Sequence, residues 1–218
     1  MTLKTVDSAE QDIRSGLVVL TVGHSTLTYD RFLSLLRSSS VNAVADVRTA
    51  PYSRHFPQFN REYLKDELRA DEVAYTFLGK ELGGRPANKQ LYSDDVADYE
   101  KMAKTDDFKK GLDRVIEGAK KYRVALMCSE HDPLDCHRCL LVARALRERD
   151  VEVRHILSNG QIVSQSDIEN RLLDMAGRQN DDMFASREER LSIAYRDRAR
   201  KVAFADPKDG PSGDVAAE

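Results

Sequence analysis

The chain has 218 residues, of which 41% are hydrophobic and 33% are charged, and its formal net charge is -3. This length predicts one domain with a short appendage, and the composition permits a sizeable core beneath a well-solvated surface. The weak negative charge excludes the overall positive field that is typical of a dedicated nucleic-acid-binding protein, although a local basic patch stays compatible with it.

The sequence favours a cytoplasmic protein with reduced thiols and no membrane partner. No apolar stretch approaches the roughly 20 residues that a membrane-spanning helix needs. The charged N-terminal residues do not resemble a secretory signal. Three cysteines in a chain of this length do not form the pattern of a disulfide framework.

Strand-like and helix-like patterns alternate along the chain. A helix capped by Thr28 follows the first apolar run, and Asp132 with Pro133 is typical of the start of a helix over 133–149. Ser166 has the pattern of a further helix start. Strands are expected at 17–22, 41–45, 73–78, 123–127 and 151–157, and the other helices at 61–70, from about 108, and within 187–204. This alternation predicts a three-layer α/β domain, a mostly parallel sheet flanked by helices, with a C-terminal helical extension.

Composition divides the chain into four parts. Charged and polar residues dominate both ends, and a polar linker follows Ala176. The expected organisation is a disordered N-terminus (1–14), an α/β domain (15–175), a helical extension (176–205) and a disordered tail (206–218).

Reactive side chains follow four of the expected strands, at the point where each strand ends. His24 follows the first, Asp46 and Arg48 the second, Arg85 the third, and Cys128 closes the fourth. Ligands of open α/β sheets bind beyond the carboxyl ends of the strands, because loops and helix N-termini converge there. We therefore expect one composite site at this edge.

Four motifs occur in one order along the chain, and together they resemble the DUF488 family over roughly Val18 to Leu173. The motifs are Gly23-His24-Ser25, Asp46-Val47-Arg48 with Ser53, Leu82-Gly83-Gly84, and Cys128-Ser129-Glu130 with Cys136-His137-Arg138. The resemblance implies a compact three-layer α/β domain with a single pocket that holds these motifs. It implies no reaction, because the family is named for having no established function. Cys139 and the segment beyond Ala176 lie outside the family pattern.

The leading hypothesis is an enzyme, a hydrolase or transferase, that acts on a phosphate-bearing small molecule, a nucleotide or a nucleic-acid end in an anion-binding pocket. His24, Asp46 and Glu130 are the candidates for general acid and base, and Cys128 is either a nucleophile or part of the pocket wall. Arginine side chains, close backbone approach at glycines and a helix N-terminus would hold the anion. The candidate substrate-binding residues are Ser25, Arg48, Ser53, Gly83, Gly84, Arg85, Cys136, His137 and Arg138.

Two other classes of function stay open at this stage. One is a non-catalytic module that binds a nucleotide or nucleic acid. The other is a thiol-redox or metal-dependent protein that uses Cys128 and Cys136. Cys136 and Cys139 have the spacing of half a zinc site, but no matching half follows, so we assign no metal ligand and no cofactor. The oligomeric state is not predicted.

Overall fold

The computed structural model describes residues 16–179 and 185–206. Both stretches predicted to be disordered, 1–14 and 206–218, lie outside these residues except for Asp206. The described part contains a six-stranded sheet and a two-stranded hairpin. The sheet consists of β1 (Val18–Gly23), β2 (Ala43–Asp46), β3 (Ala74–Phe77), β6 (Val124–Cys128), β7 (Glu152–Ile156) and β8 (Ile162–Ser164). The hairpin pairs β4 (Tyr92–Ser93) with β5 (Val96–Ala97).

The sheet is mostly parallel, as the alternation of strands and helices predicted. Its strand order is β3-β2-β6-β1-β7-β8, and only the β7–β8 pair is antiparallel. The strand predicted as the last, at 151–157, is therefore followed by one more, β8. This short strand adds to the edge of the sheet after the turn at Gly160, whose φ of 91° suits glycine.

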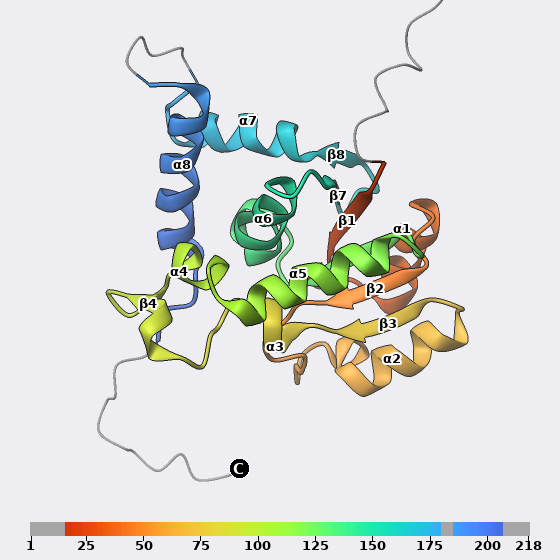
Figure 1. Cartoon of the computed structure of the whole chain (residues 1–218). Helices are drawn as coiled ribbons and strands as arrows, with labels where there is room; N and C mark the ends of the chain where they lie inside the picture. The colour runs from red at the N-terminus through yellow and green to blue at the C-terminus, as the bar shows by residue number, and fades with distance from the viewer. Residues whose placement is uncertain (1–15, 180–184, 207–218) are drawn as a thin grey trace, which may run out of the picture.

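Helices cover both faces of the sheet, which gives three layers (Figure 1). Leu126 and Cys128 of β6 pack in one core cluster, while the alternate residues Ala125 and Met127 pack in the other. The helices over one face are α1 (Tyr29–Ser38) and α2 (Arg61–Ala70), and those over the other include α5 (Asp106–Ala119) and α6 (Arg144–Arg147). The remaining helical elements are α3 (Gly79–Leu82), α4 (Tyr99–Ala103), α7 (Gln165–Met175), α8 (Arg187–Val202), the π-helix η4 (Arg138–Ala143) and the 3-10 turns η1 (Pro57–Phe59), η2 (Lys89–Leu91) and η3 (Pro133–Asp135).

The helix predicted over 133–149 begins as expected but is interrupted at Cys136, so its continuous course was wrongly predicted. Asp132 does cap a helical turn, η3, but the turn ends at Cys136, whose φ of -137° and ψ of 138° are extended. The chain re-enters a helix at Arg138, whose backbone N–H points at the Cys136 sulfur 3.4 Å away. Cys136 therefore stands in front of a helix rather than inside one, a position that helix periodicity cannot distinguish.

The sequence predicted the capping residue of one other helix correctly and misplaced that of another by two residues. Thr28 caps α1, as predicted. For α7, the capping box is formed by Ser164 and Asp167, not by Ser166. Each serine has an acidic residue three positions later, Asp167 for Ser164 and Glu169 for Ser166. The pairing is decided by β8, which ends at Ser164.

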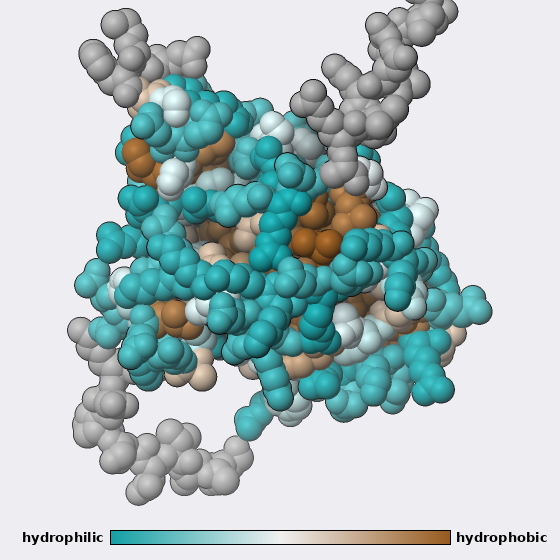
Figure 2. Space-filling model, viewed as in Figure 1, coloured by the Kyte–Doolittle hydropathy of each residue, from teal (hydrophilic) through white to brown (hydrophobic). Residues whose placement is uncertain are grey.

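The C-terminal helices α7 and α8 pack against each other at one side of the sheet (Figure 1). A buried polar chain joins them: Gln165 donates to the Tyr195 hydroxyl at 2.6 Å, and that hydroxyl lies 3.1 Å from the Glu169 carboxylate. The face shown in Figure 2 is mostly hydrophilic, with apolar residues in small separate patches. Within the described residues, no helix is both long and apolar enough to cross a membrane.

The connections of β1 and β6 leave the sheet on opposite faces, although these strands are neighbours. The chain after β1 enters α1 on one face, and the chain after β6 enters η4 and α6 on the other. Such a switch opens a crevice between the two strand ends, where ligands of α/β proteins bind. His24 and Cys128 lie on the two sides of this crevice, and the His24 N–H donates to the Cys128 carbonyl.

Candidate active site

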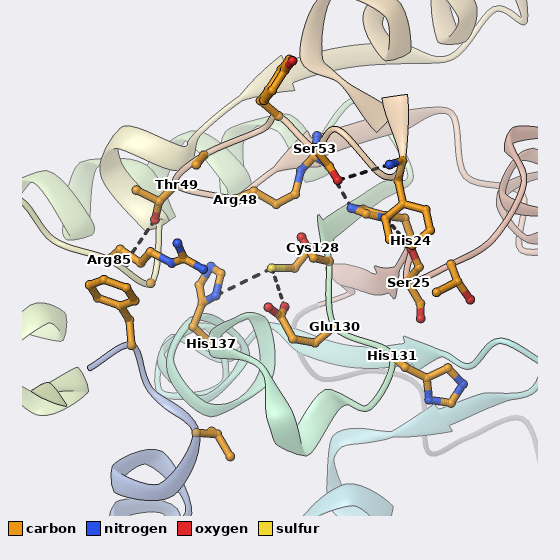
Figure 3. A pocket seen from close by; sticks show the side chains of 18 of the residues that line it. His24, Ser25, Arg48, Thr49, Ser53, Arg85, Cys128, Glu130, His131 and His137 are labelled. Carbon is orange, nitrogen blue, oxygen red and sulfur yellow. Dashed lines mark hydrogen bonds between the residues drawn. The ribbon is translucent and has the colours of Figure 1, made fainter. Parts of the chain in front are cut away.

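A cavity of about 510 Å³ lies at the carboxyl ends of β1, β2 and β6, and it gathers most of the predicted site residues (Figure 3). Predicted residues that line it are His24, Ser25, Arg48, Ser53, Gly84, Arg85, Cys128, Glu130 and His137. Four others do not line it: Asp46, Cys136 and Arg138 are buried, and Gly83 lines a neighbouring cavity. Residues that line the cavity without having been predicted include Thr26, Thr49, Tyr52, Phe56, Tyr99, His131 and Phe204.

Asp46 holds Arg48 in a buried ion pair on one wall. The Asp46 carboxylate accepts from Arg48 Nε at 2.9 Å and from Nη2 at 2.6 Å, and the Tyr75 hydroxyl donates to it at 2.7 Å. Neither charged side chain is more than 5% exposed. Although burial opposes its charge, the hydrogen bonds and charge of Asp46 raise the pKa of Arg48, which therefore stays cationic. Tyr75 escaped the sequence analysis because it lies in the middle of a strand.

His24 orients Arg48 and is uncharged. Its Nδ1 lies 3.0 Å from the Ser25 carbonyl, which accepts that N–H, so Nε2 accepts from Arg48 Nη1 at 3.2 Å. The imidazole also stacks on Phe59 with 4.2 Å between ring centroids. Burial, and then the Arg48 charge, lowers the pKa of His24 to about 4. The geometry makes His24 a positioning residue for Arg48.

One N–H of Arg48 remains for a ligand. Arg48 Nη2 donates to Asp46 and to the Phe59 carbonyl, Nε donates to Asp46, and one Nη1 N–H is directed to His24. A guanidinium has five N–H groups. The fifth, on Nη1, has no acceptor among the described residues, and Arg48 lines the cavity.

The turn after β1 is strained and tightly packed. Ser25 has a φ of 45°, a left-handed conformation that is uncommon for residues other than glycine. Gly23 has no room for a side chain, because a Cβ atom there would lie 1.9 Å from the Glu130 carbonyl oxygen. The sequence Gly23-His24-Ser25 therefore brings the β1 and β6 loops into direct contact.

The cavity floor holds a cluster of four side chains, Cys128, Glu130, Cys136 and His137, which we call the thiol cluster. Glu130 Oε2 lies 2.9 Å from each of the two sulfurs. His137 Nδ1 lies 3.7 Å from the Cys128 sulfur and 3.9 Å from that of Cys136. Figure 3 shows Cys128 between Glu130 and His137, facing into the cavity. Cys136 lies behind them, 1% exposed.

The surroundings of the thiol cluster shift the pKa values of its two cysteines in opposite directions. Burial raises the pKa of the Cys128 thiol well above its ordinary value, so that this sulfur alone is a weak nucleophile. Burial also opposes ionisation of Cys136, but the Cys128 thiol and the Arg138 and His137 charges hold its pKa well below the ordinary value. Burial and the nearby Cys136 charge raise the pKa of Glu130.

Arg138 contacts the backbone of the loop that carries Glu130. It is fully buried, and its Nη1 and Nη2 donate to the carbonyls of Glu130 and His131 at 2.7 and 3.1 Å. The Nε atom has no partner in the described structure. This arginine therefore fixes the loop that carries Glu130, and it does not reach the cavity as the sequence analysis expected of an anion-binding residue.

Arg85 forms the opposite wall, across the cavity from His24 (Figure 3). Its backbone N–H donates to Thr49, and its guanidinium lies 4.7 Å from the centre of the Phe204 ring. Gly84 precedes it and lies against His137, where a Cβ would come within 2.9 Å of the ring. The C-terminal segment after α8 thus borders the site, a contact for which the sequence carries no local signal.

Cys139 is separate from the thiol cluster. It is fully buried, and its sulfur lies 3.9 Å from Gln165 Oε1. The two cysteines of the Cys136-x2-Cys139 pattern thus have different surroundings. The second is a packed core residue rather than part of the cavity.

The family model described as "Domain of unknown function DUF488" matches residues 28–145, more than half of the chain. The chain belongs to this family. The matched range contains Arg48, Arg85 and the whole thiol cluster, while His24 lies just before it. No curated protein and no solved structure matches the chain.

Proposed function

We propose that this DUF488 protein is an enzyme that binds a phosphate-bearing substrate in the cavity and hydrolyses it or transfers its phosphate-bearing group. The observation that carries the proposal is the charge of the cavity lining. Among the described lining residues, Glu130 is the single carboxylate. It faces Arg85, with which no carboxylate of the described residues pairs, and Arg48, whose charge the buried Asp46 balances. Such a lining attracts an anion to the mouth and keeps one proton acceptor at the floor.

The anion would lie between the two arginine walls. Arg85 is exposed, and no carboxylate of the described residues pairs with it. Arg48 offers its remaining Nη1 N–H from the other wall. Hydroxyls of Ser25, Ser53 and Thr49 line the space between them and supply hydrogen bonds to phosphate oxygens.

Glu130 is the residue that we expect to move a proton. In hydrolysis, the oxygen of a water molecule bonds to phosphorus while the bond from phosphorus to the leaving oxygen breaks. Glu130 takes the proton from the attacking water, and the leaving oxygen takes a proton from solvent. In transfer, a hydroxyl of the acceptor replaces water. His24 takes no proton, because its Nε2 is held by Arg48.

The test is turnover of a panel of phosphate monoesters, phosphodiesters and nucleoside triphosphates, followed by phosphorus NMR. Glu130→Gln should lower kcat by about a hundredfold or more, the usual contribution of a general base. The control is Glu117→Gln, since Glu117 is exposed on α5 and pairs with Lys120 there. Full turnover by Glu130→Gln, or no turnover of any member by the wild type, would contradict the proposal.

A further inference from the structure

We propose that Cys128, Cys136 and His137 bind one divalent, thiophilic metal ion, zinc by its ligand preference, and that Glu130 occupies the fourth position on the cavity side. All four ligand atoms lie within 4.8 Å of one another. The inference goes beyond the proposed function, because the ion needs no phosphate to bind.

The distances from His137 to the two sulfurs are close to those of a tetrahedral ion. Zinc–sulfur and zinc–nitrogen bonds of about 2.3 and 2.0 Å place sulfur and nitrogen about 3.5 Å apart in a tetrahedron. The observed distances from His137 Nδ1 to the two sulfurs are 3.7 and 3.9 Å. Glu130 Oε2 lies closer, at 2.9 Å from both sulfurs, so the carboxylate would move outward by a few tenths of an ångström, toward the cavity.

The imidazole of His137 is already oriented as a ligand. Its Nε2 lies 2.9 Å from the Val47 carbonyl, which can only accept, so Nε2 carries a proton. In the neutral imidazole, which is the form that binds a metal, the lone pair of Nδ1 faces the two sulfurs. The charged form of His137 beside Cys136 is that of the metal-free chain. Histidine ligands of metals commonly donate their other N–H to a backbone carbonyl in this way, which fixes the tautomer and the ring plane.

The surroundings also suit two thiolates. The backbone N–H of Arg138 points at the Cys136 sulfur at 3.4 Å, which stabilises a negative charge there. Two thiolates and the Glu130 carboxylate carry three negative charges. A divalent ion and the buried Arg138 guanidinium carry three positive charges, so the buried group is neutral as a whole.

The site would border the cavity, with one ligand fully behind its lining. Cys136 is buried, but Cys128, Glu130 and His137 line the cavity. Zinc sites with two cysteines and one histidine commonly leave the fourth position for water or substrate. Glu130 can therefore leave the ion toward the cavity, where it would be free to accept the proton in the proposed reaction.

Cobalt(II) is the probe, because its spectrum reports both geometry and sulfur ligation. The full chain is stripped of metal, kept reduced and titrated with cobalt chloride in the absence of phosphate. We expect one ion per chain, the intense visible bands of a tetrahedral ion and sulfur-to-cobalt charge-transfer bands. Zinc should then displace the cobalt.

Variants separate the thiol cluster from the rest of the chain. Cys136→Ser and His137→Gln should weaken cobalt binding by more than about a hundredfold, because even loss of a partner outside the ligand set costs about 10- to 100-fold. Cys139→Ala is the matched control, since Cys139 is equally buried but lies against Gln165, and it should bind cobalt like the wild type.

Absence of charge-transfer bands in the wild type, an octahedral spectrum, or equal binding by Cys136→Ser would overturn the inference. The wild-type spectrum decides even if a variant fails to fold. A protein that binds cobalt through two sulfurs but turns over no phosphate compound contradicts the proposed function alone. Phosphate turnover by a chain that binds no cobalt contradicts this inference alone.

Discussion

Replacing Asp46 with asparagine should remove a large part of the free energy of unfolding of this domain. The substitution keeps the side-chain volume but removes the charge that compensates Arg48, and both groups are at least 95% buried. Breaking a buried ion pair from one side costs about 3–5 kcal/mol, because the remaining charge is left without a partner. The Tyr75 hydroxyl and the Arg48 backbone N–H also lose a carboxylate acceptor.

Equilibrium unfolding in urea, followed by circular dichroism, measures this loss. With a slope of about 2 kcal/mol per molar, a loss of about 4 kcal/mol lowers the midpoint by about 2 M. The double variant Asp46→Asn, Arg48→Met should be less destabilised than the two single losses added together, because it leaves no unpaired charge. A loss below about 1 kcal/mol for Asp46→Asn, or strict additivity, would refute the reasoning.

Three further changes test other parts of the structure. Burial lowers the pKa of His155 to about 4, against about 6.5 in the unfolded chain. The neutral imidazole therefore contributes to the free energy of unfolding above pH 6.5, and this contribution declines by up to about 3 kcal/mol as the pH falls toward 4. Urea midpoints measured between about pH 7.5 and 4.5 should decline less for His155→Gln than for the wild type. Gly23→Ala should destabilise the chain and shift the loop that carries Glu130, because the alanine Cβ would lie 1.9 Å from the Glu130 carbonyl oxygen. A melting temperature equal to that of the wild type would contradict this packing. Tyr195→Phe should lower the free energy of unfolding by about 1–3 kcal/mol and speed amide hydrogen exchange in α8, because Gln165 and Glu169 lose the Tyr195 hydroxyl as a hydrogen-bond partner. Unchanged exchange would show that this contact does not hold α8.

The sequence predicted the strands and most helices because their apolar periodicity is simple. The run that became β6 alternates between two covered faces, and α1 starts at the Thr28 cap as its pattern indicated. The interruption at Cys136 was missed, because one extended residue barely disturbs an apolar pattern that otherwise fits a helix. β8 was missed because three residues at a sheet edge carry little pattern of their own.

The candidate site was predicted as a group but not in its connections. Strand ends in a parallel sheet meet at one edge, so His24, Arg48 and Cys128 could be placed together from topology. Which partner each side chain would take could not be predicted, because these contacts join distant segments. The Val47 carbonyl that orients His137 and the carbonyls that hold Arg138 are backbone atoms, which no residue pattern reveals.

The four proposed metal ligands were predicted as site residues, but the sequence alone did not assign them as one ligand set. Cys128 and Glu130 lie on one side of η3, and Cys136 and His137 lie on the other, so the spacing matches no paired zinc motif. Only the fold of the turn brings them together.

The most direct test of the central claim is the affinity of the cavity for pyrophosphate, measured by isothermal titration calorimetry. We predict saturable binding of one pyrophosphate per chain, weakened about tenfold or more in Arg85→Gln, the loss of one charged hydrogen bond. Arg37→Gln is the control, since Arg37 is an exposed arginine that pairs with Asp71 on another surface, and its affinity should equal that of the wild type. Absence of binding, or equal affinity in Arg85→Gln and the wild type, would contradict the account.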